Sequence, residues 1–251
     1  MAGKSTGLGD RLYIDGLDLS GDIGSIGTVN GGPKALDVTA IDKSGYERLG
    51  GTRDGAVEFT AFFNPDAGQA HPTLAALPTA DRVVSYFRGT TLGNPAASLV
   101  AKQLGYDPSR NEDGSLTFKV SALANGYGVE WGEQVTDGKI TEATAPGRRD
   151  VLDTAAAASF GMQAYLHVFA FTGTDLTVKM QHSTDNVTYA DIAGGFTFAA
   201  ITAAPTSDRV KTATSTTTIN RYLRVNLSTT GGFATVTFAV MVVKNLVSVV
   251  F

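Results

Sequence analysis

Hydrophobic and polar residues alternate along most of the chain, and the clearest alternation begins at Val57. One face of this segment carries Val57, Phe59, Ala61 and Phe63, and the other carries Glu58, Thr60 and Phe62. A period of two residues is typical of a strand with one buried face. Similar patterns predict strands at 11–19, 36–41, 82–88, 96–106, 115–123 and 129–136, although 96–106 also fits a helix.

Residues 64–82 contain the stretch that most clearly favours a helix. It is short, and Pro72 and Pro78 bound it. Strands precede and follow this segment without the regular alternation of strand and helix that a parallel sheet requires. We therefore expect an antiparallel sheet with one short helix at its side.

The second half of the chain has a different pattern. Residues 144–158 interrupt the alternation with proline, glycine, paired arginines and a run of alanines, which predicts a domain boundary. Beyond it, strands are expected at 160–171, 176–182, 188–192, 197–201, 209–213, 217–227 and 234–243. Turns recur about every 8 to 15 residues, which is typical of a sandwich or jelly roll.

These patterns predict a mainly β protein. The expected domains are a β-sandwich or barrel with one flanking short helix over residues 1–145, a linker at 146–159, and a second β-sandwich of jelly-roll or immunoglobulin-like type over 160–251. A chain of 251 residues accommodates two such domains.

The segment before Val57 combines charge with glycine, and we expect a loop over 42–55. From Lys43 on, its charged residues are Lys43, Glu47, Arg48, Arg53 and Asp54, with four glycines among them. Such a loop cannot bury a core of its own, so it is either idle surface or an arm held by a partner. Tyr46 and Leu49 would be its apolar anchors, and charges of both signs can fix the register between subunits.

Composition narrows the classes of function. Charged residues make up 18% of the chain, below the roughly 25% of typical soluble domains, which indicates that partners cover much of the surface. Residues 1–145 carry 12 Lys and Arg against 18 Asp and Glu, whereas residues 146–251 carry 8 against 6. An acidic first half argues against a surface that grips phosphates. Contact with DNA without adhesion stays open.

The sequence also bears on the compartment. There is no cysteine, so disulfides and thiol chemistry are excluded. No run approaches the roughly 18 apolar residues of a membrane helix, and the N-terminal segment lacks the apolar stretch of a signal peptide. We expect synthesis and folding in a cytosol and no membrane partner.

The histidines and a pair of aspartates are the first candidates for chemistry. His71, His167 and His182 are too scattered to predict a metal triad, and His167 fits a packing or surface role. Asp185 and Asp191 frame a segment that lacks the dense carboxylate set of a calcium loop. An Asx turn between two strands is the favoured interpretation there.

Other catalytic patterns are weaker still. Glu130 and Glu133 lie three residues apart in a predicted strand, so they face opposite sides and do not form a glycosidase pair. Lys4, Ser5 and Thr6 end a GKST sequence without the upstream glycine, strand and following helix of a phosphate-binding loop. No serine stands in a GxSxG context. We expect no catalytic residue, metal or cofactor, and hence no enzyme.

Several longer segments resemble a known family. They are KSGYERLGGTRDGAVEFTAFFN at 43–64, HPTLAAL at 71–77, the stretch at 164–198, and INRYLRVNLSTTGGFATVTFAVMVVKN at 219–245. In this order they are similar to the major tail proteins of long-tailed siphophages of actinobacteria. The similarity covers most of the chain and lies in segment order and turn-strand phrases, with no catalytic motif.

The resemblance implies a tail-tube fold over residues 10–142, assembled into rings whose inner strands line a channel. Rings, hexameric in preference to trimeric, would stack into the tail tube through which the genome leaves the capsid. The loop at 42–55 would reach a neighbouring subunit. Its assembly residues would be Lys43, Tyr46, Glu47, Arg48, Leu49, Arg53 and Asp54. Glu58 and Thr60 would face the lumen.

The resemblance also implies partners and a location. The chain would bind copies of itself and the tape-measure, terminator and distal tail proteins, and double-stranded DNA would pass without adhering. It would reside in the virion tail after assembly in the host cytoplasm, and the second half would decorate the tube or, in a trimeric ring, form part of its wall. A ring also closes the edge strands that a β-rich chain exposes.

A second interpretation comes from a different class of function. The predicted sandwich of the second half contains aromatic residues that suit stacking on sugar rings: Tyr165, His167, Tyr189 and Tyr222. The alternative is therefore a glycan-binding adhesin module.

Overall fold

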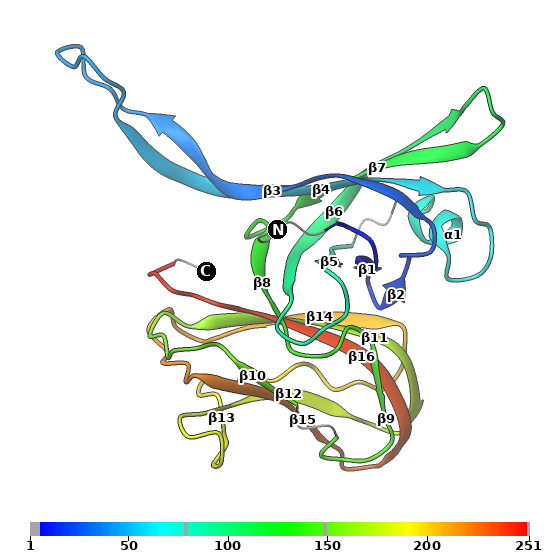
Figure 1. Cartoon of the computed structure of the whole chain (residues 1–251), viewed down its shortest axis with the longest axis vertical. Helices are drawn as coiled ribbons and strands as arrows, with labels where there is room; N and C mark the ends of the chain where they lie inside the picture. The colour runs from blue at the N-terminus through cyan, green and yellow to red at the C-terminus, as the bar shows by residue number, and fades with distance from the viewer. Residues whose placement is uncertain (1–5, 78–79, 148–149, 250–251) are drawn as a thin grey trace. The chain divides into compact units, whose positions relative to one another are not determined.

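Antiparallel β-strands make up almost all the regular structure of residues 6–77, 80–147 and 150–249, which are the residues that the computed structural model describes (Figure 1). Contacts group the chain into two units, each built from segments distant in sequence. The first unit comprises Met1–Gly21, Val83–Ser98 and Trp131–Phe251, and the second comprises Asp22–Arg82 and Leu99–Glu130. The mainly β class predicted from the alternation is confirmed.

The second unit is a four-stranded antiparallel sheet with the strand order β3-β4-β7-β6. Its strands are β3 (Ile23–Asp37), β4 (Arg48–Phe62), β6 (Pro95–Arg110, whose first residues belong to the first unit) and β7 (Leu116–Ala124). Strand β4 pairs with β3 from Ala61 to Arg48, but with β7 only from Phe62 to Ala56. The β3–β4 and β6–β7 hairpins therefore extend beyond the sheet at opposite ends, as Figure 1 shows.

One face of this sheet is covered. Val57, Phe59 and Ala61 are buried as the alternation predicts, whereas Phe63, beyond the end of β4, is 42% exposed. On this face lies the helix α1 (Ala70–Leu74), whose His71 ring centre is 4.6 Å from that of Phe63. His71 Nδ1 also lies 2.9 Å from the hydroxyl oxygen of Tyr106.

The predicted short helix is thus confirmed, but its expected limits change. Pro72 lies inside α1, in the first turn, where a proline loses no helical hydrogen bond. Pro78 lies outside the described residues. Asp22 Oδ2 accepts the backbone N–H of Ala70 at 2.9 Å. This hydrogen bond joins the start of the helix to the residue that precedes β3.

The first unit contains two antiparallel sheets. One has the order β14-β11-β16-β8-β6-β5-β1-β2, with β9 also paired to β16, and the other has the order β10-β15-β12-β13. The strands of the first sheet are β1 (Arg11–Ile14), β2 (Leu17–Asp18), β5 (Arg82–Phe87), β8 (Glu130–Gln134), β9 (Ile140–Glu142), β11 (Met162–Gly173), β14 (Thr206–Lys211) and β16 (Phe233–Lys244). The second sheet contains β10 (Val151–Asp153), β12 (Thr177–Ser183), β13 (Ala190–Asp191) and β15 (Tyr222–Ser228).

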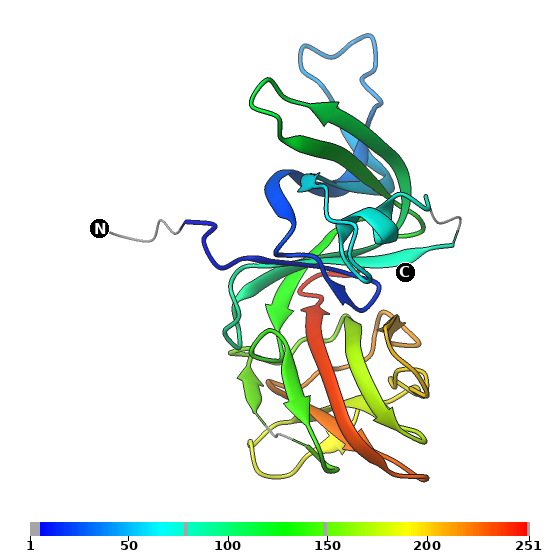
Figure 2. The same cartoon turned by 90° about the vertical axis from the view of Figure 1, so that its right-hand side faces the viewer.

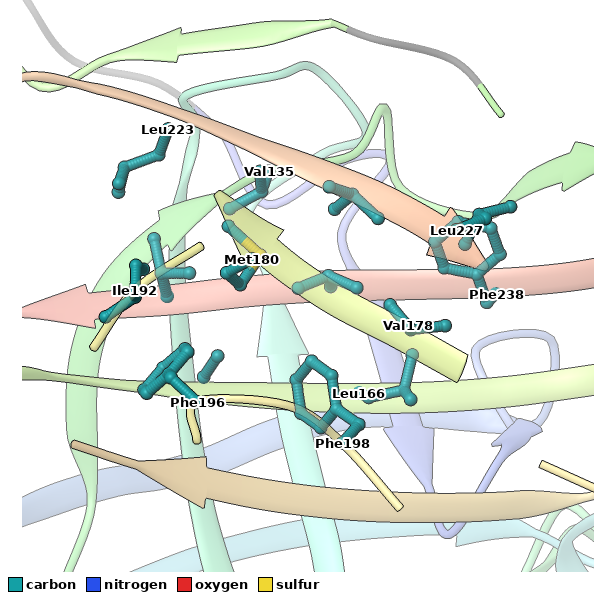
Figure 3. Packing of buried hydrophobic residues seen from close by; sticks show 14 of the residues in the cluster. Val135, Leu166, Val178, Met180, Ile192, Phe196, Phe198, Leu223, Leu227 and Phe238 are labelled. Carbon is teal, nitrogen blue, oxygen red and sulfur yellow. The ribbon is translucent and has the colours of Figure 1, made fainter. Parts of the chain in front are cut away.

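These two sheets form a β-sandwich around one apolar core, and Figure 2 shows them from a second direction. Alternate residues of β11 and β16, such as Leu166 and Phe238, meet alternate residues of β12 and β15, such as Val178 and Leu227 (Figure 3). Phe196 and Phe198 fill the space beside them from a segment without regular strand structure. The strands predicted at 176–182 and 234–243 both contribute to this core, with Leu176, Val178 and Met180 from the first and Val236, Phe238, Val240 and Val242 from the second.

Several predicted strand limits are wrong. Residues 11–19 form a hairpin of β1 and β2, because Asp15 and Gly16 both adopt positive φ angles and turn the chain. Residues 197–201 make only isolated bridges, at Thr197 and Ile201, to β12 and its preceding residue Leu176. The segment 96–106, open between strand and helix in the sequence, belongs to strand β6.

The largest difference concerns the glycine-rich segments around residues 23–35 and 48–55. The loop expected over 42–55 includes the second of these segments, yet the two segments pair with each other as β3 and β4. Glycine weakens an isolated strand, but two long antiparallel partners satisfy each other's backbone groups. Residues 38–47 connect the two strands. Of the expected loop 42–55, only residues 42–47 therefore lie outside a strand.

The division expected at residue 145 does not coincide with the contact units. Strand β16 pairs with β8 and β9, which precede residue 145, so both sides of that position share one sheet. Within the expected linker 146–159, β10 pairs with β15. Independent folding of 1–145 and 160–251 stays a prediction.

Candidate functional site

The tip of the β3–β4 hairpin is closed by a small network of hydrogen bonds. The backbone N–H of Val38 donates to the Glu47 carbonyl at 3.0 Å. Thr39 Oγ1 donates to Asp37 Oδ1 at 2.6 Å and accepts the backbone N–H of Glu47 at 2.9 Å. The Thr39 side chain thus supplies hydrogen bonds where the backbone pairing of β3 and β4 ends, and these bonds fix the start of the connection 38–47.

The predicted assembly residues divide into two groups along this hairpin. At the tip, Lys43 Nζ lies 3.6 Å from Glu47 Oε1, and the Arg48 guanidinium lies 4.7 Å from the Tyr46 ring centre. Arg53 instead lies further along β4, over the ring of Tyr127 at 4.5 Å.

Arg53 and Asp54 lie at the base of the hairpin, near residues 127–129. There Asp54 Oδ1 accepts the backbone N–H of Gly55 at 2.8 Å. Leu49 is an exposed residue of the tip. Of the seven predicted residues, five therefore share the tip and two lie at the base.

Exposed apolar side chains gather at the tip. Tyr46 is 74% exposed and Leu49 59% exposed, and three further large apolar residues share this exposure: Leu36, Val38 and Ile41. The sequence interpretation named only the first two as anchors. The alternation of Leu36 and Val38 at the end of β3 was the signal for the others.

The base of the hairpin depends on missing side chains. A Cβ at Gly55 would lie 2.5 Å from the backbone nitrogen of Val129, and a Cβ at Gly31 would lie 2.8 Å from its Cβ. Contacts this short are not tolerated between real side-chain atoms, so these positions in β3 and β4 require glycine. The chain at 128–129 crosses the hairpin there at backbone distance.

The second face of the sheet is open and polar. Glu58 is exposed and Thr60 half-buried, as expected for the side opposite Val57. Thr60 is paired in register with Lys119, which is paired in turn with Asp107, while Glu58 is paired with Ser121. These residues line a shallow hollow of about 310 Å³. Lys119 and Asp107 are additions that the sequence interpretation missed, because strand pairing is needed to place them beside Thr60.

The proposed sugar-stacking set is wrong for two of its four residues. Tyr165 and His167 are 1% and 0% exposed, so neither can meet a ligand. The ring of Tyr189 is already covered by the Arg224 guanidinium at 3.8 Å. Tyr222 is half-buried with Arg221 4.9 Å from its ring centre. A packing role for His167 is confirmed.

The other candidate sites reduce to local structure. Asp185 Oδ1 accepts the backbone N–H groups of Val187 at 2.9 Å and Thr188 at 2.8 Å, so the predicted Asx turn is confirmed. Lys4 and Ser5 lie outside the described residues. Within residues 6–77, 80–147 and 150–249, no group of three His, Asp or Glu side chains is placed to hold a metal ion. The one helix described there is too short to cross a membrane.

Comparison with known proteins gives structural likeness only. No protein-family model matches the sequence, and no curated protein matches it. A chain of the virion of a native gene transfer agent particle matches 51% of this chain and 98% of its own, with 11% identity and a TM-score of 0.40. The Dit protein of phage SPP1, described as a hub adsorption apparatus in phages infecting Gram-positive hosts, matches 92% and 98% with 8% identity and a TM-score of 0.36.

A third likeness is to the phage p2 baseplate in its activated conformation with strontium, over 94% of this chain and 98% of that one. The identity is 11% and the TM-score 0.31. At these values the likenesses do not define a function for the chain.

Proposed function

We propose that this protein is a structural component of a virion that polymerises into stacked rings and forms the tail tube of a siphophage, through which the genome reaches the host. The observation that carries the proposal is the β3–β4 hairpin, a long arm whose tip exposes a group of apolar side chains. Tyr46, Leu49 and Ile41 are all more than half exposed. Exposed apolar groups of this size, rimmed by charge, mark sites of protein association.

The open sheet face supports the same function. A wall that double-stranded DNA passes must offer polar groups without an excess of positive charge, because each neutralised phosphate releases counterions and favours adhesion. The face around Glu58 and Thr60 carries Lys119 with two carboxylates, those of Glu58 and Asp107. We propose that this face lines the lumen.

Ring formation also suits the exposed edge of the second unit. Strand β3 pairs with β4 and lies at the edge of its sheet. A long unpaired edge invites pairing with other chains, and a closed ring limits that pairing to a defined neighbour. We propose a hexamer in preference to a trimer, with the tape-measure, terminator and distal tail proteins as further partners, in the tail of a virion of an actinobacterial phage assembled in the host cytoplasm.

Electron microscopy of the purified full-length protein, alone and with its tail-initiating proteins, tests this function. We expect rings of uniform diameter that stack into tubes, and their end-on views report the ring symmetry. A protein that stays monomeric under both conditions, up to the highest concentration at which single particles can be distinguished, would overturn the proposal.

A further inference from the structure

The hairpin belongs to the second unit, and the first unit contains an exposed apolar site of its own, centred on Trp131. Trp131 is the only tryptophan of the chain and is 50% exposed. It follows Glu130 in β8, and its ring is nearly perpendicular to that of Tyr86, with the ring centres 6.4 Å apart. Nearby, Leu246 is 73% exposed and Val247 67% exposed. Exposed apolar side chains that are grouped together, unlike single ones, mark interaction sites.

Trp131 borders a hollow of about 320 Å³. Its walls include Pro95, Trp131, Glu133, Val242, Lys244 and Leu246. Gly132 contributes to it because its Cα approaches β16 closely: a Cβ there would lie 1.9 Å from the Val242 carbonyl oxygen. The hollow therefore combines the apolar side chains of Trp131, Val242 and Leu246 with the charged side chains of Glu133 and Lys244.

The two charges of this hollow are in different states. The Lys244 ammonium donates hydrogen bonds to the Thr154 hydroxyl and to the carbonyl oxygen of Ala156. Among the residues that the structure describes, none donates a hydrogen bond to the Glu133 carboxylate. Partial burial raises the pKa of Glu133 above its usual value, and attraction to Lys244 offsets only part of this rise. A half-buried carboxylate without a donor favours a ligand that brings one.

A guanidinium group fits these surroundings. It can stack on an indole ring and donate two hydrogen bonds to a carboxylate at the same time, whereas an ammonium cannot do both. Arg48 presents such a group on the β3–β4 tip, stacked on exposed Tyr46. Its neighbours Tyr46, Leu49 and Ile41 are the apolar complement of Trp131 and Leu246.

We propose that the hollow beside Trp131 and Glu133 receives the β3–β4 hairpin tip of a second copy of this chain, with Arg48 of that tip against Trp131 and Glu133. The inference rests on the proposed self-assembly and names the surface that receives the arm. Arg110, on the β6–β7 hairpin, is the competing cation, but its neighbours Asn111, Glu112 and Asp113 are polar. The apolar side chains of Trp131, Val242 and Leu246 in the hollow favour the apolar tip.

The single tryptophan supplies a direct readout. A Trp131→Phe protein retains its hairpin but has no indole emission, so it can be titrated into wild-type protein at a fixed low concentration. We expect the wild-type emission maximum to shift to shorter wavelength as Trp131 is covered. When Arg48→Glu is added to the Trp131→Phe protein, we expect the apparent affinity to fall by at least about 10-fold. The matched change Arg110→Glu should leave the titration unchanged.

A charge exchange completes the test. Glu133→Lys in the protein that retains Trp131 should weaken binding of the wild-type hairpin. It should also raise the apparent affinity for the Arg48→Glu hairpin by about 10-fold. An unshifted emission, a response to Arg110→Glu in place of Arg48→Glu, or a charge exchange without restoration would each overturn the assignment.

The outcome is separable from that of the tail-tube function. Tubes that form without any response of Trp131 would remove the receiving site and leave the function standing. A response that follows the charge exchange, in a protein that never forms rings, would support the contact and remove the tube.

Discussion

His167 donates its Nε2 proton to the hydroxyl of Ser85, with 2.8 Å between the nitrogen and the oxygen. The direction is fixed because Nδ1 accepts the backbone N–H of Gly16 at 3.2 Å, and a neutral imidazole has a single N–H. Ser85 is in turn 2.5 Å from the hydroxyl of Ser98. Burial lowers the pKa of His167 to about 3, so this network is built on the neutral ring.

The free energy of unfolding should therefore depend on pH. An unfolded histidine binds a proton below about pH 6.5, whereas folded His167 does so only near pH 3, so the unfolded state binds more protons between these values. Stability from this group is complete above pH 6.5 and is lost as the pH falls. We expect a loss of about 2 kcal/mol between pH 7 and pH 5, measured by urea unfolding.

His167→Gln isolates this contribution. Glutamine can still hydrogen-bond Ser85 but takes up no proton, and His182, whose pKa burial also lowers, remains in both proteins. The variant will be less stable at pH 7, but its loss between pH 7 and pH 5 should be smaller by about 2 kcal/mol. Equal losses in the two proteins would contradict the assignment of the effect to His167.

The glycine contacts at the hairpin base give a second prediction. Gly55→Ala places a methyl group 2.5 Å from the backbone nitrogen of Val129, so the crossing chain must move. We expect a cost of about 2 to 4 kcal/mol in the free energy of unfolding. Gly27→Ala is the matched change in β3, since its Cβ meets the Glu58 carbonyl oxygen at an ordinary 3.5 Å. A cost for Gly55→Ala no larger than that for Gly27→Ala would contradict the steric argument.

The hairpin also shows what sequence pattern can and cannot predict. The alternation of Val57, Phe59 and Ala61 reports burial on one face, and the structure confirms it. Residues 48–54 show no such alternation, because both faces of the projecting part of the hairpin are exposed or half-buried. Charge and glycine content therefore predicted a loop, although pairing with β3 makes a strand.

The candidate site was only partly accessible to the same reasoning. Tyr46 and Leu49 were found because apolar residues stand out in a charged segment. Asp107 and Lys119 were missed because their proximity to Thr60 arises from strand pairing across a long separation in sequence. Tyr165 was misassigned as a ligand group, because an aromatic residue in a strand has the same local pattern whether its face is buried or exposed.

Shortening the arm tests its role in assembly without disturbing the sheet. Val38 and Glu47 are already joined by a backbone hydrogen bond, so Thr39–Tyr46 can be replaced by Asn-Gly, which favours a two-residue hairpin turn. We expect a folded protein with a melting temperature within a few degrees of wild type and no rings in electron microscopy.

Gly45→Ala is the control for this change, since a Cβ there meets no atom within 4 Å and should leave assembly intact. Tubes of normal length from the shortened protein would exclude the arm from assembly.

The open sheet face leads to a prediction about DNA. Glu58 is exposed and close in register to Lys119, so Glu58→Lys would bring together two positive side chains on a face proposed to line the lumen. Tubes of this variant should retain short fluorescent duplex DNA on sedimentation, and retention should fall steeply as salt is raised, because binding releases counterions. Asp66→Lys makes the same change of charge at an exposed position before α1 that does not line the hollow beside Glu58. If both variants retain equal amounts of DNA, net charge is responsible and Glu58 does not face the lumen.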